Sequence, residues 1–255
     1  MIDTKKRSVA KALSWRAIAI AVLAITSYLT TDDIRTASLI TLFYHSIQFG
    51  IFFIHERVWN MFNWGRSRGL FIQMTGMSGA GKTTLAKLVQ KRLQKQGVQI
   101  EVIDGDEYRL NLCNDLGFSK EDRNTNIRRL GFVAKVLARN NVVSIISAIN
   151  PYDKVRGELS NTYDNVKTVY VKCDLDTLKE RDTKGLYRKA LLPDGHPDKI
   201  YNFTGVSDPF EEPSAADLEI NTASEELEAS AKKLERFIVE NIQRKHTSTS
   251  PGSGI

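Results

Sequence analysis

A glycine-rich turn between an apolar run and a helical pattern constrains this chain more than any other feature. Residues 76–83 read Gly-Met-Ser-Gly-Ala-Gly-Lys-Thr, the full G-x-x-x-x-G-K-[ST] pattern, after the apolar run 69–75 and before the helical pattern 84–96. Glycines let the backbone curl so that consecutive N–H groups point at phosphate oxygens, at the positive end of the following helix. The pattern predicts a buried strand, a phosphate-binding loop (P-loop) and a helix.

The residues of this loop have distinct expected roles. Lys82 is expected to reach the β- and γ-phosphates of a nucleotide, and the Thr83 hydroxyl is expected to bind Mg²⁺. The other residues are expected to contribute backbone N–H groups and close packing. The predicted nucleotide-binding set is Gly76, Ser78, Gly79, Ala80, Gly81, Lys82, Thr83 and Thr84.

Two carboxylates follow a second predicted strand, 98–103. Asp104 and Asp106, with Arg109 three residues on, would lie where parallel α/β sheets bind their ligands. One carboxylate could accept a proton from a substrate hydroxyl, and the other could hold Mg²⁺ through water. The alternative interpretation is a helix-capping turn, to which Asp is well suited.

A predicted helix that starts near Ser119 and runs to about Asn140 carries Arg123 and Asn126. These two residues are three apart and share a helix face, as a clamp for phosphate or sulfate requires. A lone arginine at such a position would more often be a solvated surface charge.

The rest of the chain indicates an α/β domain, a P-loop NTPase-type fold with a mainly parallel sheet flanked by helices, over residues 67–245. The tail 246–255 is rich in Ser, Thr, Gly and Pro, and we expect it to be disordered. The further predicted strands are 142–148, 167–171 and 218–221, and the further predicted helices are 175–190 and 225–243.

The net charge of +6 is concentrated at the N-terminus. Residues 1–70 hold nine basic and four acidic side chains, a net of +5, whereas the remaining 185 residues carry a net of +1. The charge therefore gives no reason to expect a nucleic-acid partner for the α/β domain.

Two charge-free apolar runs, 17–31 and 36–54, lie within residues 1–66 and are separated by a short polar turn. A membrane-spanning helix needs about 20 residues, so we expect a transmembrane hairpin with helices at about 13–31 and 36–55. Lys and Arg number five before the first run, one in the turn and three after the second, which predicts both termini and the α/β domain in the cytoplasm. A signal peptide and a buried soluble hairpin are the alternatives.

Six motifs follow one another along the chain: GMSGAGKTT (76–84), DGDEYR (104–109), GFSKEDRNTNIRR (117–129), INPYDKVR (149–156), CDLDTLKERDTKGLY (173–187) and NFTGVSDPFEEP (202–213). They resemble those of adenylylsulfate kinases, and the resemblance covers residues 69–243. It implies ATP- and Mg²⁺-dependent phosphorylation of the 3′-hydroxyl of adenosine 5′-phosphosulfate (APS), giving 3′-phosphoadenosine 5′-phosphosulfate (PAPS) and ADP in sulfate assimilation.

The resemblance also implies roles for single residues. Phe118 and Phe203 would enclose the substrate adenine, although lone aromatic residues usually belong to a core. Asp106 would lie near the attacking hydroxyl, and Lys184 would belong to a lid over both nucleotides. The implied catalytic set is Lys82, Asp104, Asp106 and Lys184; the implied substrate-binding set is Asp106, Arg109, Phe118, Arg123, Asn126, Ile149, Asn150, Lys184 and Phe203.

Two departures from the family pattern bear on mechanism. Asn150 stands where many family members have a Ser before the Pro. Asn has no hydroxyl, so a phosphoenzyme intermediate at this position is excluded and direct in-line transfer is expected. The lid between Ala190 and Phe203 is longer than the commoner family form, which bears on substrate choice.

The N-terminal segment resembles a two-helix membrane domain of bacterial proteins whose function is unassigned. The resemblance rests on SWR (14–16) and on HERVWN with the following WG (55–65). A P-loop kinase for another nucleotide or a sugar, and a membrane regulator with a non-catalytic nucleotide domain, are the alternative functions. The chain is also a candidate homodimer.

Overall fold

The computed structural model describes residues 9–15, 17–19, 22, 34–61, 69–182 and 184–243. The chain divides into two compact units, Met1–Arg66 and Ser67–Ile255, each of which is considered by itself. The expected disordered tail 246–255 and most of the first expected membrane helix, 13–31, lie outside the described residues.

The C-terminal unit is built on a five-stranded sheet in the order β2-β3-β1-β4-β5. Every pairing between these strands is parallel, which confirms the expected α/β class. β1, at the centre, is buried along its whole length, which is why its residues are mainly apolar, with Gln73 and Thr75 as buried polar exceptions. The strands are β1 (Leu70–Thr75), β2 (Ile100–Asp104), β3 (Val143–Ser147), β4 (Val166–Lys172) and β5 (Leu218–Asn221).

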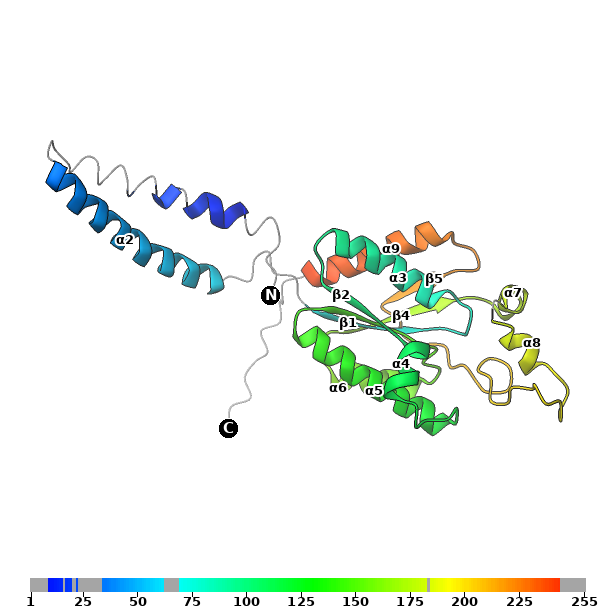
Figure 1. Cartoon of the computed structure of the whole chain (residues 1–255). Coiled ribbons are helices and arrows are strands. Elements are labelled where there is room, and N and C mark those ends of the chain that lie inside the picture. Colours follow the sequence, from blue (N-terminus) through cyan, green and yellow to red (C-terminus); the bar gives the residue numbers. More distant parts are fainter. Residues whose placement is uncertain are drawn as a thin grey trace. The chain divides into compact units, whose positions relative to one another are not determined.

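Helices cover both faces of this sheet. α3 (Lys82–Lys95) and α9 (Leu227–Gln243) pack together on one face, and α5 (Lys120–Arg139) and α6 (Asp153–Thr162) on the other (Figure 1). Each face has its own apolar core: Leu85 and Leu234 belong to the first, and Ile127 and Leu159 to the second. The sheet is therefore rigid and buried, and its carboxyl edge is left for the site.

The single helix expected over 175–190 is in fact two helices, α7 (Leu175–Arg181) and α8 (Leu186–Ala190). Asp182 ends α7 and its carboxylate accepts hydrogen bonds from the backbone N–H groups of Tyr187 and Arg188. Gly185 has a left-handed φ of 65°, which redirects the chain into α8. The turn places residues 184–187 beside the carboxyl edge of the sheet.

The N-terminal unit contains α2 (Ile34–Met61), and residues 9–15 and 17–19 are also helical. The expected helix 36–55 was too short at its C-terminal end, because no Gly or Pro occurs between Ile51 and Gly65 to stop it. Within the described residues, none of the helices combines the length and the apolar character needed to cross a bilayer.

Candidate active site

The P-loop connects β1 to α3 and depends on its glycines. A Cβ on Gly76 would lie 2.4 Å from the backbone oxygen of Val171, so only glycine lets the loop pass this close to β4. Gly79 and Gly81 adopt left-handed φ values of 78° and 87°. No side chain caps the N-terminus of α3 at Gly81, so its N–H groups remain available to phosphate oxygens.

Lys82 lies inside this loop and is only 8% exposed. Its Nζ donates hydrogen bonds of 2.8 Å to the carbonyl oxygens of Gly76 and Met77. Burial lowers the pKa of Lys82 to about 8; the negative charge of Asp106 opposes this shift, and the positive charge of Lys184 adds to it. The ammonium is thus held where it can meet phosphate oxygens, with its charge only weakly stabilised.

Thr83, Asp104 and Ser147 form an oxygen cluster at the ends of three elements. The Thr83 hydroxyl donates to Asp104 Oδ2 at 2.7 Å and lies 2.9 Å from Ser147 Oγ. Burial works to raise the pKa of Asp104, but hydrogen bonds from Thr83 and two backbone N–H groups lower it overall. Hard oxygen donors of this kind fit Mg²⁺, which takes few protein ligands and completes its shell with phosphates and water.

Asp104 also performs the capping role that was the alternative interpretation of its motif. Its Oδ1 accepts from the backbone N–H groups of Asp106 and Glu107, at 2.9 and 3.2 Å, at the start of α4 (Gly105–Leu112). The cap fixes the carboxylate so that the other oxygen faces Thr83. Capping and metal-site chemistry are therefore compatible here.

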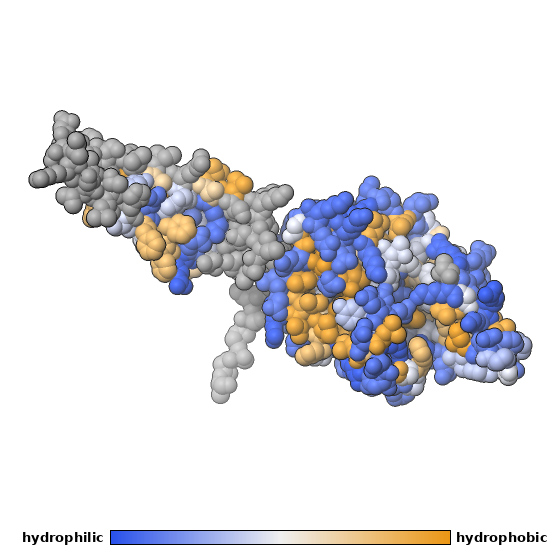
Figure 2. All heavy atoms as spheres, in the orientation of Figure 1, coloured by the Kyte–Doolittle hydropathy of each residue, from blue (hydrophilic) through white to orange (hydrophobic). Residues whose placement is uncertain are grey.

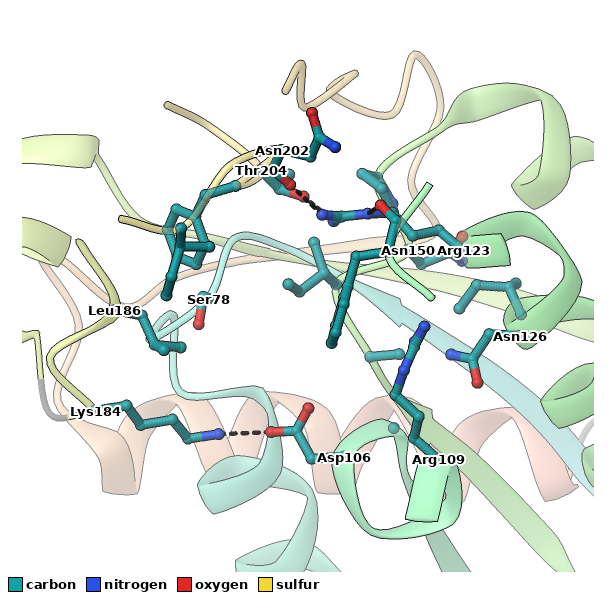
Figure 3. Close-up of a pocket in the computed structure, with 18 of the residues that line it drawn as sticks. Ser78, Asp106, Arg109, Arg123, Asn126, Asn150, Lys184, Leu186, Asn202 and Thr204 are labelled. Atoms are coloured by element: carbon teal, nitrogen blue, oxygen red, sulfur yellow. Dashed lines mark hydrogen bonds and ion pairs between the residues drawn. The ribbon is translucent and has the colours of Figure 1, made fainter. Parts of the chain in front are cut away.

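A cavity of about 400 Å³ lies beside the P-loop, between α4, α5 and residues 184–204 (Figure 3). It is lined by every residue of the expected substrate-binding set. The expected residues found in its lining are Ser78, Asp106, Arg109, Phe118, Arg123, Asn126, Ile149, Asn150, Lys184 and Phe203.

Asp106 and Lys184 face each other across this cavity (Figure 3). Lys184 Nζ lies 2.6 Å from Asp106 Oδ2, and both side chains are exposed, at 61% and 81%. An ion pair between such exposed groups adds little to stability. The pair matters because it places Lys184, a residue of the expected lid, beside the Asp106 carboxylate at the start of α4.

Positive charge gathers where α4 and α5 border the cavity. The Arg109 guanidinium lies 4.3 Å from the centre of the Phe118 ring. Arg123 donates to the carbonyl of Phe118 at 2.9 Å and also to Thr204 Oγ1. Asn126 is 7% exposed and lines the same cavity, and its side-chain amide N–H groups can donate to an anion. This end of the cavity suits an anionic group.

The two phenylalanines differ in setting. Phe203 is 8% exposed and packs edge-on against Tyr187, with ring centres 5.0 Å apart, so it is partly a core residue. Phe118 is 64% exposed on the same cavity, which is unusual for a large apolar side chain and excludes a core role.

Comparisons with known proteins identify the family of the C-terminal unit. The family model described as adenylylsulphate kinase matches residues 68–221, more than half of the chain. The chain belongs to the adenylylsulfate kinase family. The expected family is confirmed, and with it the reaction, ATP-dependent phosphorylation of APS to PAPS. A second family model, described as a predicted membrane protein, matches residues 9–60.

Two adenylyl-sulfate kinases are similar to most of the C-terminal unit. A probable adenylyl-sulfate kinase of Synechocystis is 46% identical over 175 residues, covering 69% of this chain and 96% of the relative. The adenylyl-sulfate kinase of Rippkaea orientalis is 46% identical over 169 residues, covering 66% of this chain and 91% of the relative. The structure of the Mycobacterium tuberculosis APS kinase with AMPPNP and APS has a TM-score of 0.63 at 32% identity, covering 68% of this chain and 99% of that one.

Sequence reasoning missed several residues that hold the site of this kinase together. Ser147 meets Thr83 because β3 lies between β1 and β2. The Tyr187 hydroxyl donates to the carbonyl of Ser78 at 2.8 Å, and Thr222 Oγ1 donates to that of Ala80 at 3.0 Å. Tyr187 is the last residue of the motif CDLDTLKERDTKGLY, so the sequence offered a signal for it. Thr222 follows a short strand and belongs to none of the six motifs.

The lowered pKa of Lys82 predicts a pH-dependent affinity for ATP. The protonated ammonium attracts phosphate, so affinity should fall as pH rises through about 8 and the proton is lost. We expect the dissociation constant for ATP to rise about 10-fold between pH 7 and pH 9, measured by calorimetry. A constant affinity over this range would contradict the assignment, and Lys82→Met should bind weakly at both pH values.

Proposed function

We propose that this kinase binds ATP on the P-loop and APS in the 400 Å³ cavity, and transfers the γ-phosphate directly between them. The observation that carries the proposal is the meeting of a carboxylate, Asp106, and the anion-binding group of Arg109, Arg123 and Asn126 on one cavity. Ser78 belongs both to this cavity and to the P-loop, so the two nucleotides would meet there.

The proposed roles follow from the chemistry of transfer. Asp106 accepts the proton of the 3′-hydroxyl as the new O–P bond forms, and the bond from the γ-phosphorus to the bridging oxygen of ADP breaks. Lys82 and Lys184 offset negative charge on the transferred group. Thr83 and Asp104 hold Mg²⁺, which supplies further charge neutralisation when bound. Asn150 carries no hydroxyl, so the proposed transfer is a single step.

The direct test is ADP release by the full-length chain in detergent, measured in a coupled assay. ATP and Mg²⁺ should give little ADP until APS is added, and AMP, which lacks the sulfate, should replace APS poorly. ADP release that does not depend on APS would contradict the proposal.

Phe118 is proposed to stack on the substrate adenine. Because Phe118 is exposed, Phe118→Ala should leave stability unchanged while removing about 1–3 kcal/mol of stacking. We expect the KM for APS to rise about 5- to 150-fold with the KM for ATP unchanged. Phe118→Tyr, which keeps the ring, should restore most of the affinity; equal APS affinity in the Ala variant and the wild type would remove Phe118 from the site.

We also propose that the N-terminal unit is a two-helix membrane anchor with the kinase on the cytoplasmic side. α2 exposes large apolar side chains, including Phe49 at 76%, Ile54 at 61% and Met61 at 80%. Figure 2 shows hydrophobic side chains on the surface of the described part of this unit. Such side chains are costly to leave in water and mark a surface that meets lipid or protein. The basic flanks favour lipid with both ends in the cytoplasm.

A polar cluster joins the two segments of this unit. Ser14 Oγ lies 2.9 Å from His55 Nε2, and Trp59 Nε1 lies 3.0 Å from the same nitrogen. Lys11 pairs with Glu56 at 3.2 Å, so the SWR and HERVWN motifs meet here. Contacts of this kind fix the register of a helical hairpin.

The anchor predicts how the full-length kinase fractionates. It should remain with membranes after a wash in 1 M salt, which removes proteins bound by charge alone, and should be released by detergent. Detection by antibody and by APS-dependent activity should agree. Recovery in the salt supernatant would contradict insertion and would favour a charge-bound or soluble unit.

A further inference from the structure

Arg156 is a buried arginine beside the acceptor cavity that has no role in the scheme above. It lies in α6 and is 2% exposed. Its Nη1 donates to the carbonyl of Asn150 at 2.7 Å, and its Nη2 donates to the carbonyl of Glu211 at 2.5 Å and to Asp153 Oδ1 at 3.1 Å. One guanidinium therefore joins two backbone segments that are far apart in sequence.

The first segment is the wall of the cavity, residues 149–151. Asn150 has a left-handed φ of 47°, a conformation that asparagine adopts more readily than most residues other than glycine. Its carbonyl accepts from both Arg156 and Thr75, the latter at 2.9 Å. The Ile149 carbonyl accepts from the backbone of Gly76 at 3.1 Å, so the wall is tied to the start of the P-loop.

The second segment is a strap, residues 202–211, whose first three residues line the same cavity. The Tyr152 hydroxyl donates to Asp208 at 2.9 Å, and the backbone N–H of Glu211 donates to the carbonyl of Pro151 at 2.9 Å. Arg156 adds the bond to Glu211. The strap that carries Phe203 is thus fastened to the wall by a buried network.

Stability alone does not explain an arginine in this place. Its burial is costly, and a buried ionic group is often replaceable by an apolar one without loss of stability. A guanidinium, however, presents donors in a rigid planar fork, which can hold two carbonyl groups in a fixed relation. Lysine cannot reproduce that geometry from a single ammonium.

We propose that Arg156 is a positioning residue for the acceptor nucleotide, which holds wall and strap at the spacing that admits the adenosine of APS. The proposal rests on APS binding in this cavity, as proposed above. It makes Arg156 a determinant of affinity for the acceptor, acting through the backbone of Asn150 and Glu211 without touching the reacting groups.

The test is the kinetics of Arg156→Lys in the full-length chain. Losing one charge-assisted bond of the fork should raise the KM for APS about 10- to 100-fold, while the KM for ATP and kcat at saturating APS stay within about threefold. Arg128→Lys is the matched control, because Arg128 makes a two-pronged pair with Glu158 at 2.7 Å on the exposed side of α5. It should match the wild type in all three constants.

Tyr152→Phe is a second, independent variant, since it removes only the hydroxyl bond to Asp208. It should raise the KM for APS by a smaller factor of about 3 to 10, again with the KM for ATP unaffected.

If Arg156→Lys does not fold, the Tyr152→Phe variant decides: an unchanged KM for APS overturns the proposal. A loss of ATP affinity, kcat and melting temperature together in Arg156→Lys would also overturn it, since that is the signature of general loosening. Wild-type enzyme without APS-dependent activity would instead refute the function.

Discussion

Asp106→Asn should lower kcat by about 10²- to 10⁴-fold, the range for loss of a positioned proton acceptor. The amide has nearly the same shape as the carboxylate, and the side chain is exposed at the start of α4, so folding should be unaffected. ATP binding, measured by calorimetry, should stay within about twofold because Asp106 lines the acceptor cavity. ADP release at saturating APS measures the loss.

Glu107→Gln is the matched control for this experiment. Glu107 is the next residue on α4, is exposed and is not part of the cavity lining. Its variant should retain wild-type turnover. If Asp106→Asn retained it as well, the proton would have to be accepted elsewhere, and the role assigned to Asp106 would be wrong.

Lys82→Met should lower kcat/KM for ATP by at least about 10²- to 10³-fold, as expected when a preorganised positive donor is removed from phosphoryl transfer. Methionine has a similar length and no charge, and burial already disfavours the charged form of Lys82. The melting temperature should change little, because relief of the buried charge is offset by loss of the hydrogen bonds to Gly76 and Met77; thermal unfolding without nucleotide measures it.

Lys91→Met provides the comparison on the same helix, because Lys91 is exposed on α3 away from the P-loop. It should leave both kcat/KM and the melting temperature unchanged. Retained activity in Lys82→Met would show that the lysine does not contact the reacting phosphates.

The parts of the kinase that could be predicted are those in which local signals agree. The fully buried β1 corresponds to a mainly apolar run, and the glycines after it allow the left-handed backbone conformations of the P-loop. Arg123 and Asn126 were placed on one face by helical spacing alone, and both line the cavity. The substrate-binding set needed the motif resemblance, because aromatic residue type does not distinguish Phe118 from a core residue.

The features that could not be predicted depend on contacts between distant segments. Ser147 reaches Thr83 only through the strand order, which no local pattern encodes. The break between α7 and α8 is the exception, because its signals are local: no apolar residue occurs between Leu178 and Leu186, and Gly185 adopts a left-handed φ. Arg156 reads as an ordinary helix-surface charge until Glu211 is brought beside it.

The short segment from Lys184 to Tyr187 has a consequence for the order of events in turnover. Lys184 contacts Asp106 on the acceptor side, and Tyr187 holds the carbonyl of Ser78 on the donor side. One segment therefore contacts both sites, and a displacement of this segment would break both contacts at once. Release of PAPS and of ADP should then be linked through a shared opening step, so that each product slows the departure of the other.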